Sequence, residues 1–78
     1  MKLDIGKRYE VRGSQYACGI VESITYDAGK SIVHVNYYDS NNKYICNTQV
    51  NGDGNFNDNG IKHNFDLLGK GAVVDYSK

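Results

Sequence analysis

Oxygen-bearing side chains are concentrated in the segment 50–60, VNGDGNFNDNG, at a spacing suited to binding calcium. Calcium loops of the hand type take oxygen ligands from positions 1, 3, 5, 7, 9 and 12 and have glycine at position 6. If Gly54 takes the sixth position, Asn51, Asp53 and Asn57 take the third, fifth and ninth, but the twelfth lacks the carboxylate it needs. We therefore interpret the segment as a long, mobile Asn/Gly-rich loop, with Asp53, Asn51 and Asn57 as weak metal candidates.

Cysteine and histidine could supply a zinc site or a nucleophile, and the chain has two of each: Cys18, Cys46, His34 and His63. Structural zinc sites draw on closely spaced ligand pairs, and the sequence contains no such pair. No serine lies in a nucleophile-elbow motif, and no phosphate-binding glycine loop of the G-x-x-x-x-G-K type is present. We therefore expect neither an enzyme nor a cofactor. The cysteines are expected to be reduced and partly buried, with a disulfide as the open alternative.

Tyrosine dominates the aromatic residues, with seven copies against two phenylalanines and no tryptophan. We predict that Tyr16, Tyr26, Tyr38 and Tyr44 form an exposed patch, because exposed tyrosine is favoured at protein–protein interfaces. Phe56 is a lone aromatic residue among polar and glycine neighbours. Two interpretations of it stay open: the ring folds back over the end of the core, or it inserts into a partner.

Composition limits the classes of protein that the chain fits. Residues 1–78 make one small domain, 40% hydrophobic, whose short apolar segments are typical of globular proteins. No apolar run approaches the roughly 20 residues of a membrane helix, and the N-terminus, MKLDIGKRYE, lacks a secretory core, so we expect a cytoplasmic protein. Nine Lys and Arg balance nine Asp and Glu, and this neutral charge disfavours binding nucleic acid through its phosphates.

Short segments with period-two alternation, separated by turn residues, predict an all-β chain. The expected strands are residues 7–11, 17–26, 31–39, 43–50, 61–68 and 72–76. The sequences between them, such as DAGK and SNNK, are typical hairpin turns. The predicted fold is a small antiparallel barrel of five or six strands, with one long Asn/Gly-rich loop.

The order of these segments resembles the Tudor domain, a small barrel of the Src-homology type. The resemblance lies in IGKRYEV, in GIVESITYDAGKSIVHVNYYDSNNK and in NFDLL. It implies a module that reads methylated Lys or Arg, with Tyr16 and Tyr38 at cage positions and Asn41 orienting the cation. Asp39 and Asn36 stand where the family has aromatic rings. We therefore expect a tyrosine-rich contact surface rather than a complete cage.

The sequence thus predicts a non-enzymatic binding module that engages a protein partner. The predicted contact residues are Tyr16, Tyr38, Tyr44, Asn41 and Phe56, together with the loop 51–59. One alternative is a short phage-type inhibitor that acts by occlusion, suggested by the short length and an Asn-, Ile- and Lys-rich composition. A second alternative is a nucleic-acid-binding barrel, which would require the basic residues to cluster in space. Assembly into a homo-oligomer is also open.

Overall fold

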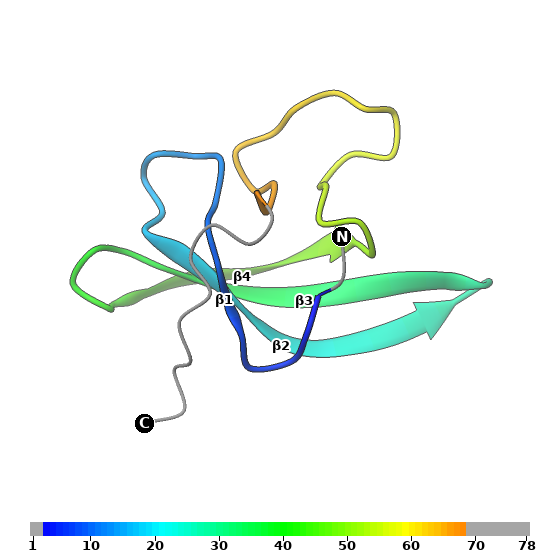
Figure 1. Ribbon diagram of the computed structural model, residues 1–78, viewed down its shortest axis with the longest axis horizontal. Coiled ribbons are helices and arrows are strands. Elements are labelled where there is room, and N and C mark those ends of the chain that lie inside the picture. Colours follow the sequence, from blue (N-terminus) through cyan, green and yellow to red (C-terminus); the bar gives the residue numbers. More distant parts are fainter. Residues whose placement is uncertain (1–2, 69–78) are drawn as a thin grey trace.

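The computed structural model describes residues 3–68, which form one antiparallel β-sheet. Its strands are β1 (Arg8–Tyr9), β2 (Cys18–Asp27), β3 (Lys30–Tyr38) and β4 (Tyr44–Asn51), in the spatial order β1-β2-β3-β4 (Figure 1). No helix forms within residues 3–68, so this part of the chain has none that could cross a membrane. The prediction of an all-β, antiparallel chain is confirmed.

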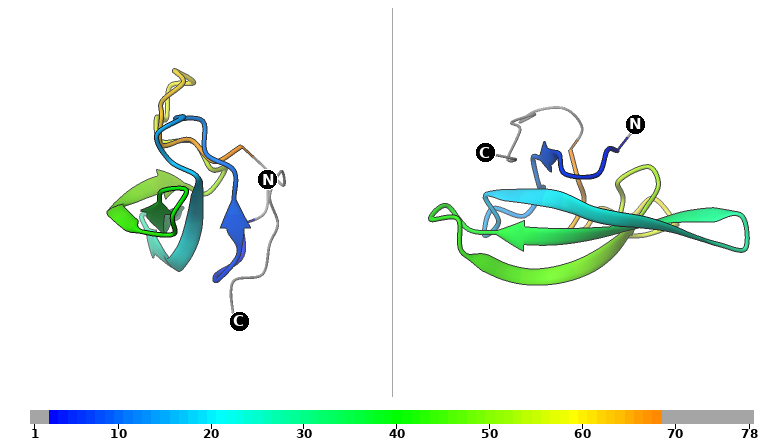
Figure 2. Two further views of the ribbon diagram at one scale, coloured as in Figure 1. Left: turned by 90° about the vertical axis from the view of Figure 1, so that its left-hand side faces the viewer. Right: turned by 90° about the horizontal axis from the view of Figure 1, so that it is seen from below.

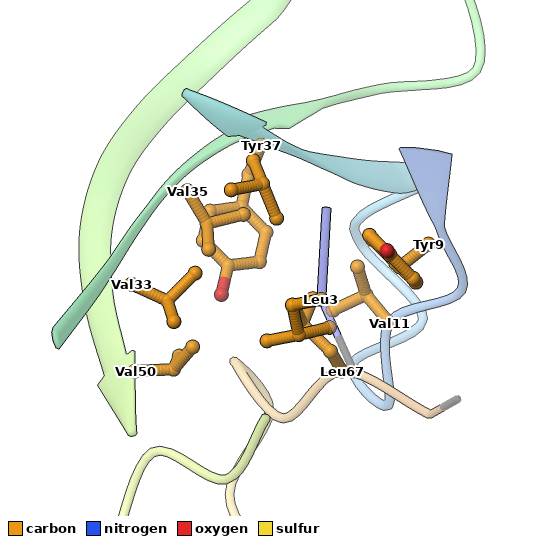
Figure 3. Close-up of a cluster of buried hydrophobic side chains, with 9 residues drawn as sticks. Leu3, Tyr9, Val11, Val33, Val35, Tyr37, Val50 and Leu67 are labelled. Carbon is orange, nitrogen blue, oxygen red and sulfur yellow. The ribbon is translucent and has the colours of Figure 1, made fainter. Parts of the chain in front are cut away.

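The core lies on one face of β3. Val33, Val35 and Tyr37 are buried and alternate with less buried residues on the opposite face, as the period-two pattern predicts. The buried cluster on this face consists of Leu3, Tyr9, Val11, Val21, Val33, Val35, Tyr37, Val50 and Leu67 (Figure 3). Burying each aliphatic side chain contributes about 1.5–3 kcal/mol to folding. This gain fixes which face of each strand turns inward.

A glycine allows other parts of the chain to lie close against the sheet. Gly19 of β2 pairs with Tyr9 in β1 and with Tyr37 in β3. A Cβ atom at this position would lie 2.9 Å from Val35 Cγ1 and 3.1 Å from Leu67 Cδ2. Because carbon atoms pack at about 3.5–4.0 Å, only glycine leaves room for these side chains.

Both long hairpins close through residues with left-handed backbone angles. In the β2–β3 turn, Ala28 and Gly29 have φ of 52° and 81°, as in a type I′ turn, so the predicted DAGK turn is confirmed. In the β3–β4 turn, Asn42 has φ of 65°. The carboxylate of Asp39 stabilises that turn by accepting the N–H of Asn41 at 2.8 Å.

The sheet is not closed into a barrel, so this part of the prediction is wrong for the residues that the structure describes. β1 has only two residues, and within residues 3–68 no strand pairs with the outer edge of β4. An isolated bridge between Val11 and Leu67 adds one further strand-like contact. The described chain therefore has four strands where five or six were expected. The predicted strand 72–76 lies outside the described residues.

Residues 61–68 do not form the predicted strand, because side chains bind their backbone donors. His63 Nδ1 accepts the N–H of Phe65 at 3.1 Å, and Asp66 Oδ2 accepts the N–H of His63 at 2.9 Å. Donors that are bound locally are lost to a strand ladder. Alternating apolar residues alone could not reveal this competition.

The Asn/Gly-rich segment after β4 turns back through backbone hydrogen bonds. Asn51 donates its N–H to Asn55 O at 2.9 Å, and Gly54 donates its N–H to Asn51 O at 2.8 Å. Gly54 is buried with φ of 91°, an angle that glycine adopts without strain, and its carbonyl accepts the N–H of Leu67 at 2.8 Å. The segment is thus packed against the end of the described chain, and the prediction of a long, mobile loop is not confirmed.

Candidate binding surface

Phe65 lies at the centre of an aromatic cluster beside the core. Its ring centroid is 5.5 Å from that of Tyr16, 5.0 Å from Tyr37, 5.3 Å from Phe56 and 5.2 Å from His63. Phe56 in turn stacks on His63 at 4.2 Å. Two of the predicted contact residues, Tyr16 and Phe56, therefore pack partly buried against the core. Of the two interpretations of Phe56, the structure shows the ring folded back.

The phenol of Tyr37 ties β3 to the aromatic cluster. Its hydroxyl donates to the carbonyl oxygen of Phe65 at 2.7 Å. Burial, followed by the nearby Cys46, Tyr16 and Asp66 groups, raises the pKa of Tyr37 far above its ordinary value. The hydroxyl is thus a neutral hydrogen-bond donor at physiological pH.

Asp66 is a buried carboxylate that holds the cluster in place. Its Oδ1 accepts the N–H of Phe56 at 2.8 Å, and its Oδ2 accepts the N–H of His63 and the Nε–H of Arg12, both at 2.9 Å. Burial alone would raise the pKa of Asp66, but these backbone and guanidinium donors outweigh it and lower the pKa below the ordinary 3.8. Since its acceptor positions are directed at the protein's own backbone, Asp66 has a structural role.

The predicted tyrosine patch is divided by the fold. Tyr38 and Tyr44 contact each other across the β3–β4 hairpin, edge to face at 6.0 Å. Tyr16 packs instead with the inward-facing Tyr37. Tyr26 pairs with Ser31 near the far end of the β2–β3 hairpin. Among the residues predicted for contact, Tyr38 and Tyr44 contact each other, and Asn41 lies in the turn that joins their strands.

Within the described residues, β4 is an edge strand of the sheet. The N–H of Asn51 points away from β3, because it donates to Asn55 O. Backbone groups alternate between the two edges of a strand, so the N–H and C=O of Asn47 and Gln49 also point away from β3. Within residues 3–68 no strand pairs with them, and Figure 2 shows β4 at the margin of the sheet.

The side chain of Asn47 is held on the face of the sheet and away from this edge. Its Nδ2 donates to Glu22 Oε1 at 3.0 Å and to Asn36 Oδ1 at 2.8 Å. The backbone groups of Asn47 are therefore accessible at the edge without interference from its own amide.

The β4 edge lacks the common protection against pairing with another chain. Natural sheets protect long edges with proline and with charged residues, especially lysine. β4 spans eight residues, YICNTQVN, with none of these. Exposed apolar side chains stand at its start, where Tyr44 is 58% and Ile45 42% exposed. This edge was not among the predicted contact surfaces, although the uncharged run 44–51 that forms it can be seen in the sequence.

The weak metal candidates stabilise local turns. Asp53 Oδ1 accepts the N–H of Asn55 at 3.0 Å, and Asn57 Nδ2 donates to Ile61 O at 3.0 Å. Asn51 Nδ2 donates to the carbonyl of Asn55 at 3.0 Å. Nowhere in the described part of the chain do three or more His, Cys, Asp or Glu residues form a metal-binding group.

The cysteines and histidines are also dispersed. Cys18 and Cys46 are free thiols, the first buried and the second half-buried. His34 contacts Thr25 at 3.0 Å on the outer face of the sheet, whereas His63 belongs to the aromatic cluster. The structure therefore does not bring these residues into one site.

Comparisons of the chain with protein-family models, with curated proteins and with solved structures gave no significant match. The open edge of β4 and the surfaces beside it are accordingly the features from which a function can be inferred.

Proposed function

We propose that the protein is a non-enzymatic binding module that takes up an extended segment of a protein partner along β4. The observation that carries this proposal is the uncharged, eight-residue edge strand with outward-pointing backbone groups at Asn47 and Gln49. Strand addition to an open edge is a common mode of peptide recognition, in which main-chain hydrogen bonds supply affinity and side chains supply specificity.

The start of β4 provides apolar contacts for the same partner. Tyr44 and Ile45 are exposed there, and the Tyr38 ring supports Tyr44 from β3. Tyrosine supplies contact area at a low cost in side-chain entropy and is enriched in interface hot spots. Asn41 lies in the turn that joins the strands of this pair. We therefore include Tyr38, Tyr44 and Asn41 among the proposed contact residues.

This function does not require the aromatic cage that the Tudor resemblance implies. It is compatible with the alternative of an inhibitor that acts by occlusion, because an inhibitor of that kind also needs a protein-binding edge. The neutral charge of the chain gives no support to the nucleic-acid alternative.

The proposal is tested with peptides selected on the wild-type protein from a phage library of random ten-residue sequences. Gln49→Pro removes an outward N–H while leaving the bonds to β3 in place, and Gln49→Ala changes only the side chain. We expect Gln49→Pro to weaken peptide binding by at least about tenfold, as the loss of one or two main-chain hydrogen bonds implies. Gln49→Ala should stay within about threefold of wild type.

Hydrogen exchange supplies an independent measurement. In the complex, the amides of Asn47 and Gln49 should exchange more slowly than in the free protein, whereas the inward-facing amide of Thr48 should change little. A thermal melt of each variant verifies its folding. If no peptide is selected, or if the selected peptides bind a folded Gln49→Pro variant as tightly as wild type, the proposed function is wrong.

A further inference from the structure

The open edge of β4 leads into a groove between the β2–β3 hairpin and the segment that follows β4. The groove consists of two adjoining shallow hollows of about 550 Å³ and 330 Å³, which share Lys30, Asn51 and Asp58 in their walls. Gln49 lines the larger hollow and also carries an outward-pointing N–H of the edge. A strand added at Gln49 therefore lies beside the groove.

The chain itself ends the open edge at this point. The N–H of Asn51 is already bound to Asn55 O, so Asn55 takes the place that a partner residue would need there. A partner strand paired with Asn47 and Gln49 must leave the edge beside Asn51. The side chain of the partner residue that follows the pair with Gln49 then lies at the groove.

The charges that line the groove are mainly negative. Asp27 lines the larger hollow, Asp53 the smaller one and Asp58 both, against a single basic residue, Lys30. Lys30 Nζ lies 3.6 Å from Asp58 Oδ2, but both side chains are about two-thirds exposed, so the pair is weak. Within residues 3–68, the carboxylate of Asp27 has no hydrogen-bond or ion-pair partner.

Four of the ten residues that line the larger hollow are apolar: Ala28, Ile32, Val50 and Phe56. Val50 is buried, and the half-buried Phe56 stacks on His63. A long basic side chain buries its methylene stem on apolar surface while its charged end stays among polar groups. A lining that combines apolar residues with three carboxylates therefore fits arginine or lysine better than it fits an acidic or a short side chain.

We infer that the partner segment carries an arginine or lysine just past the residue that pairs with Gln49, and that this side chain occupies the groove. Its stem lies on Val50 and Phe56, and its cation lies among Asp27, Asp53 and Asp58. The weakly held ammonium of Lys30 shows that a cationic side chain fits beside Asp58. The inference rests on the proposed function, because the added strand delivers the basic residue to the groove.

The test uses the same selected peptides. We expect them to contain a basic residue at a constant distance from the paired segment. Each peptide is resynthesised with citrulline, the neutral isostere of arginine, at that position, and fluorescence anisotropy gives the two dissociation constants. The basic peptide should bind about tenfold more tightly at 50 mM salt, and the difference should shrink at 0.5 M salt, where the Debye length falls below about 5 Å.

Two charge-matched double variants locate the effect. Asp27→Asn with Asp58→Asn removes two carboxylates from the groove, while Asp4→Asn with Glu10→Gln removes two exposed carboxylates that do not line it. The preference for arginine over citrulline should disappear in the first variant and persist in the second.

The outcomes separate the two proposals. If the peptides bind through β4, as shown by the Gln49→Pro variant, but citrulline binds as well as arginine, the groove inference is overturned and the edge function stands. The groove inference is likewise overturned if both charge variants reduce the preference equally. If binding does not depend on Gln49, both proposals are overturned.

Discussion

The Nε–H of Arg12 donates to the buried carboxylate of Asp66 at 2.9 Å, although the two residues are 54 positions apart in the sequence. A backbone bond from the Arg12 N–H to the Asp66 carbonyl, also 2.9 Å long, reinforces the contact. Together these two bonds hold the segment between β1 and β2 against the end of the described chain. This relationship positions the aromatic cluster, which includes Phe56, one of the residues that line the groove.

Replacing Asp66 should destabilise the protein more than replacing Arg12. Asp66→Ala leaves the N–H groups of Phe56 and His63 without their acceptor, and we expect a loss of about 3–5 kcal/mol. The Arg12 side chain is 34% exposed, and after Arg12→Ala the Asp66 carboxylate still accepts two backbone N–H groups. Arg12→Ala should therefore cost only about 1–2 kcal/mol. Urea denaturation of both variants measures the difference; equal losses would contradict this assignment.

The lowered pKa of Asp66 also predicts how the stability of the protein depends on pH. Because the folded-state pKa of Asp66 is lowered, the folded protein binds this proton less readily than the unfolded chain does. The contribution of Asp66 to stability is therefore complete above its ordinary pKa of 3.8 and is lost as pH falls through the folded pKa. Denaturation midpoints measured from pH 6 to pH 2 should fall at the acidic end. Asp66→Asn should reduce that fall, and an unchanged pH profile would exclude Asp66 as its source.

Phe56→Ala should lower the melting temperature. The ring is half-buried and stacks on His63 at 4.2 Å, so we expect a loss of about 1.5–3 kcal/mol, less than for a fully buried phenylalanine. For a domain of this size, each kcal/mol shifts the melting temperature by about 4–8 °C. Tyr26→Ala is the control, because Tyr26 is 74% exposed and should shift it little. A Phe56→Ala protein that melts at the wild-type temperature would show that the ring does not pack as described.

Gly19→Ala should be destabilising despite its small size. The added methyl group would lie 2.9 Å from Val35 Cγ1 and 3.1 Å from Leu67 Cδ2, and overpacking of this kind costs about 1–3 kcal/mol. Gly60→Ala is a useful contrast: it meets nothing within 4 Å but has φ of 83°, so its cost of about 1 kcal/mol arises from backbone strain alone. The double variant Gly19→Ala with Val35→Ala should recover part of the packing strain, whereas Gly60→Ala with Val35→Ala should show no such recovery.

Short-range patterns predicted the hairpins well. The alternation of Val33, Val35 and Tyr37 indicated the buried face of β3, and Asp27 through Lys30 indicated its turn, because both features depend on neighbours in the chain. The same alternation misassigned residues 61–68, where the side chains of His63 and Asp66 bind backbone donors that a strand would use. Those bonds depend on where the chain folds and not on periodicity.

The predicted contact residues lie in two separate places for the same reason. Tyr16 and Phe56 were grouped with Tyr38 and Tyr44 by residue type, but packing against Phe65 draws the first two partly into the core. Local alternation separates the buried Tyr37 from the adjacent Tyr38, but the surroundings of Tyr16 and Phe56 depend on contacts between distant segments.

By itself, the sequence determined the all-β class, the two hairpins and the uncharged composition of β4, since these follow from local periodicity, turn chemistry and residue type. The tertiary structure alone decided that β4 is an edge among the described residues, that Asp66 binds the backbone of Phe56 in the aromatic cluster, and that Asp27 and Asp58 line one groove. Each of these depends on which distant segments pack together, and that is set by the burial of the whole core and not by any one segment.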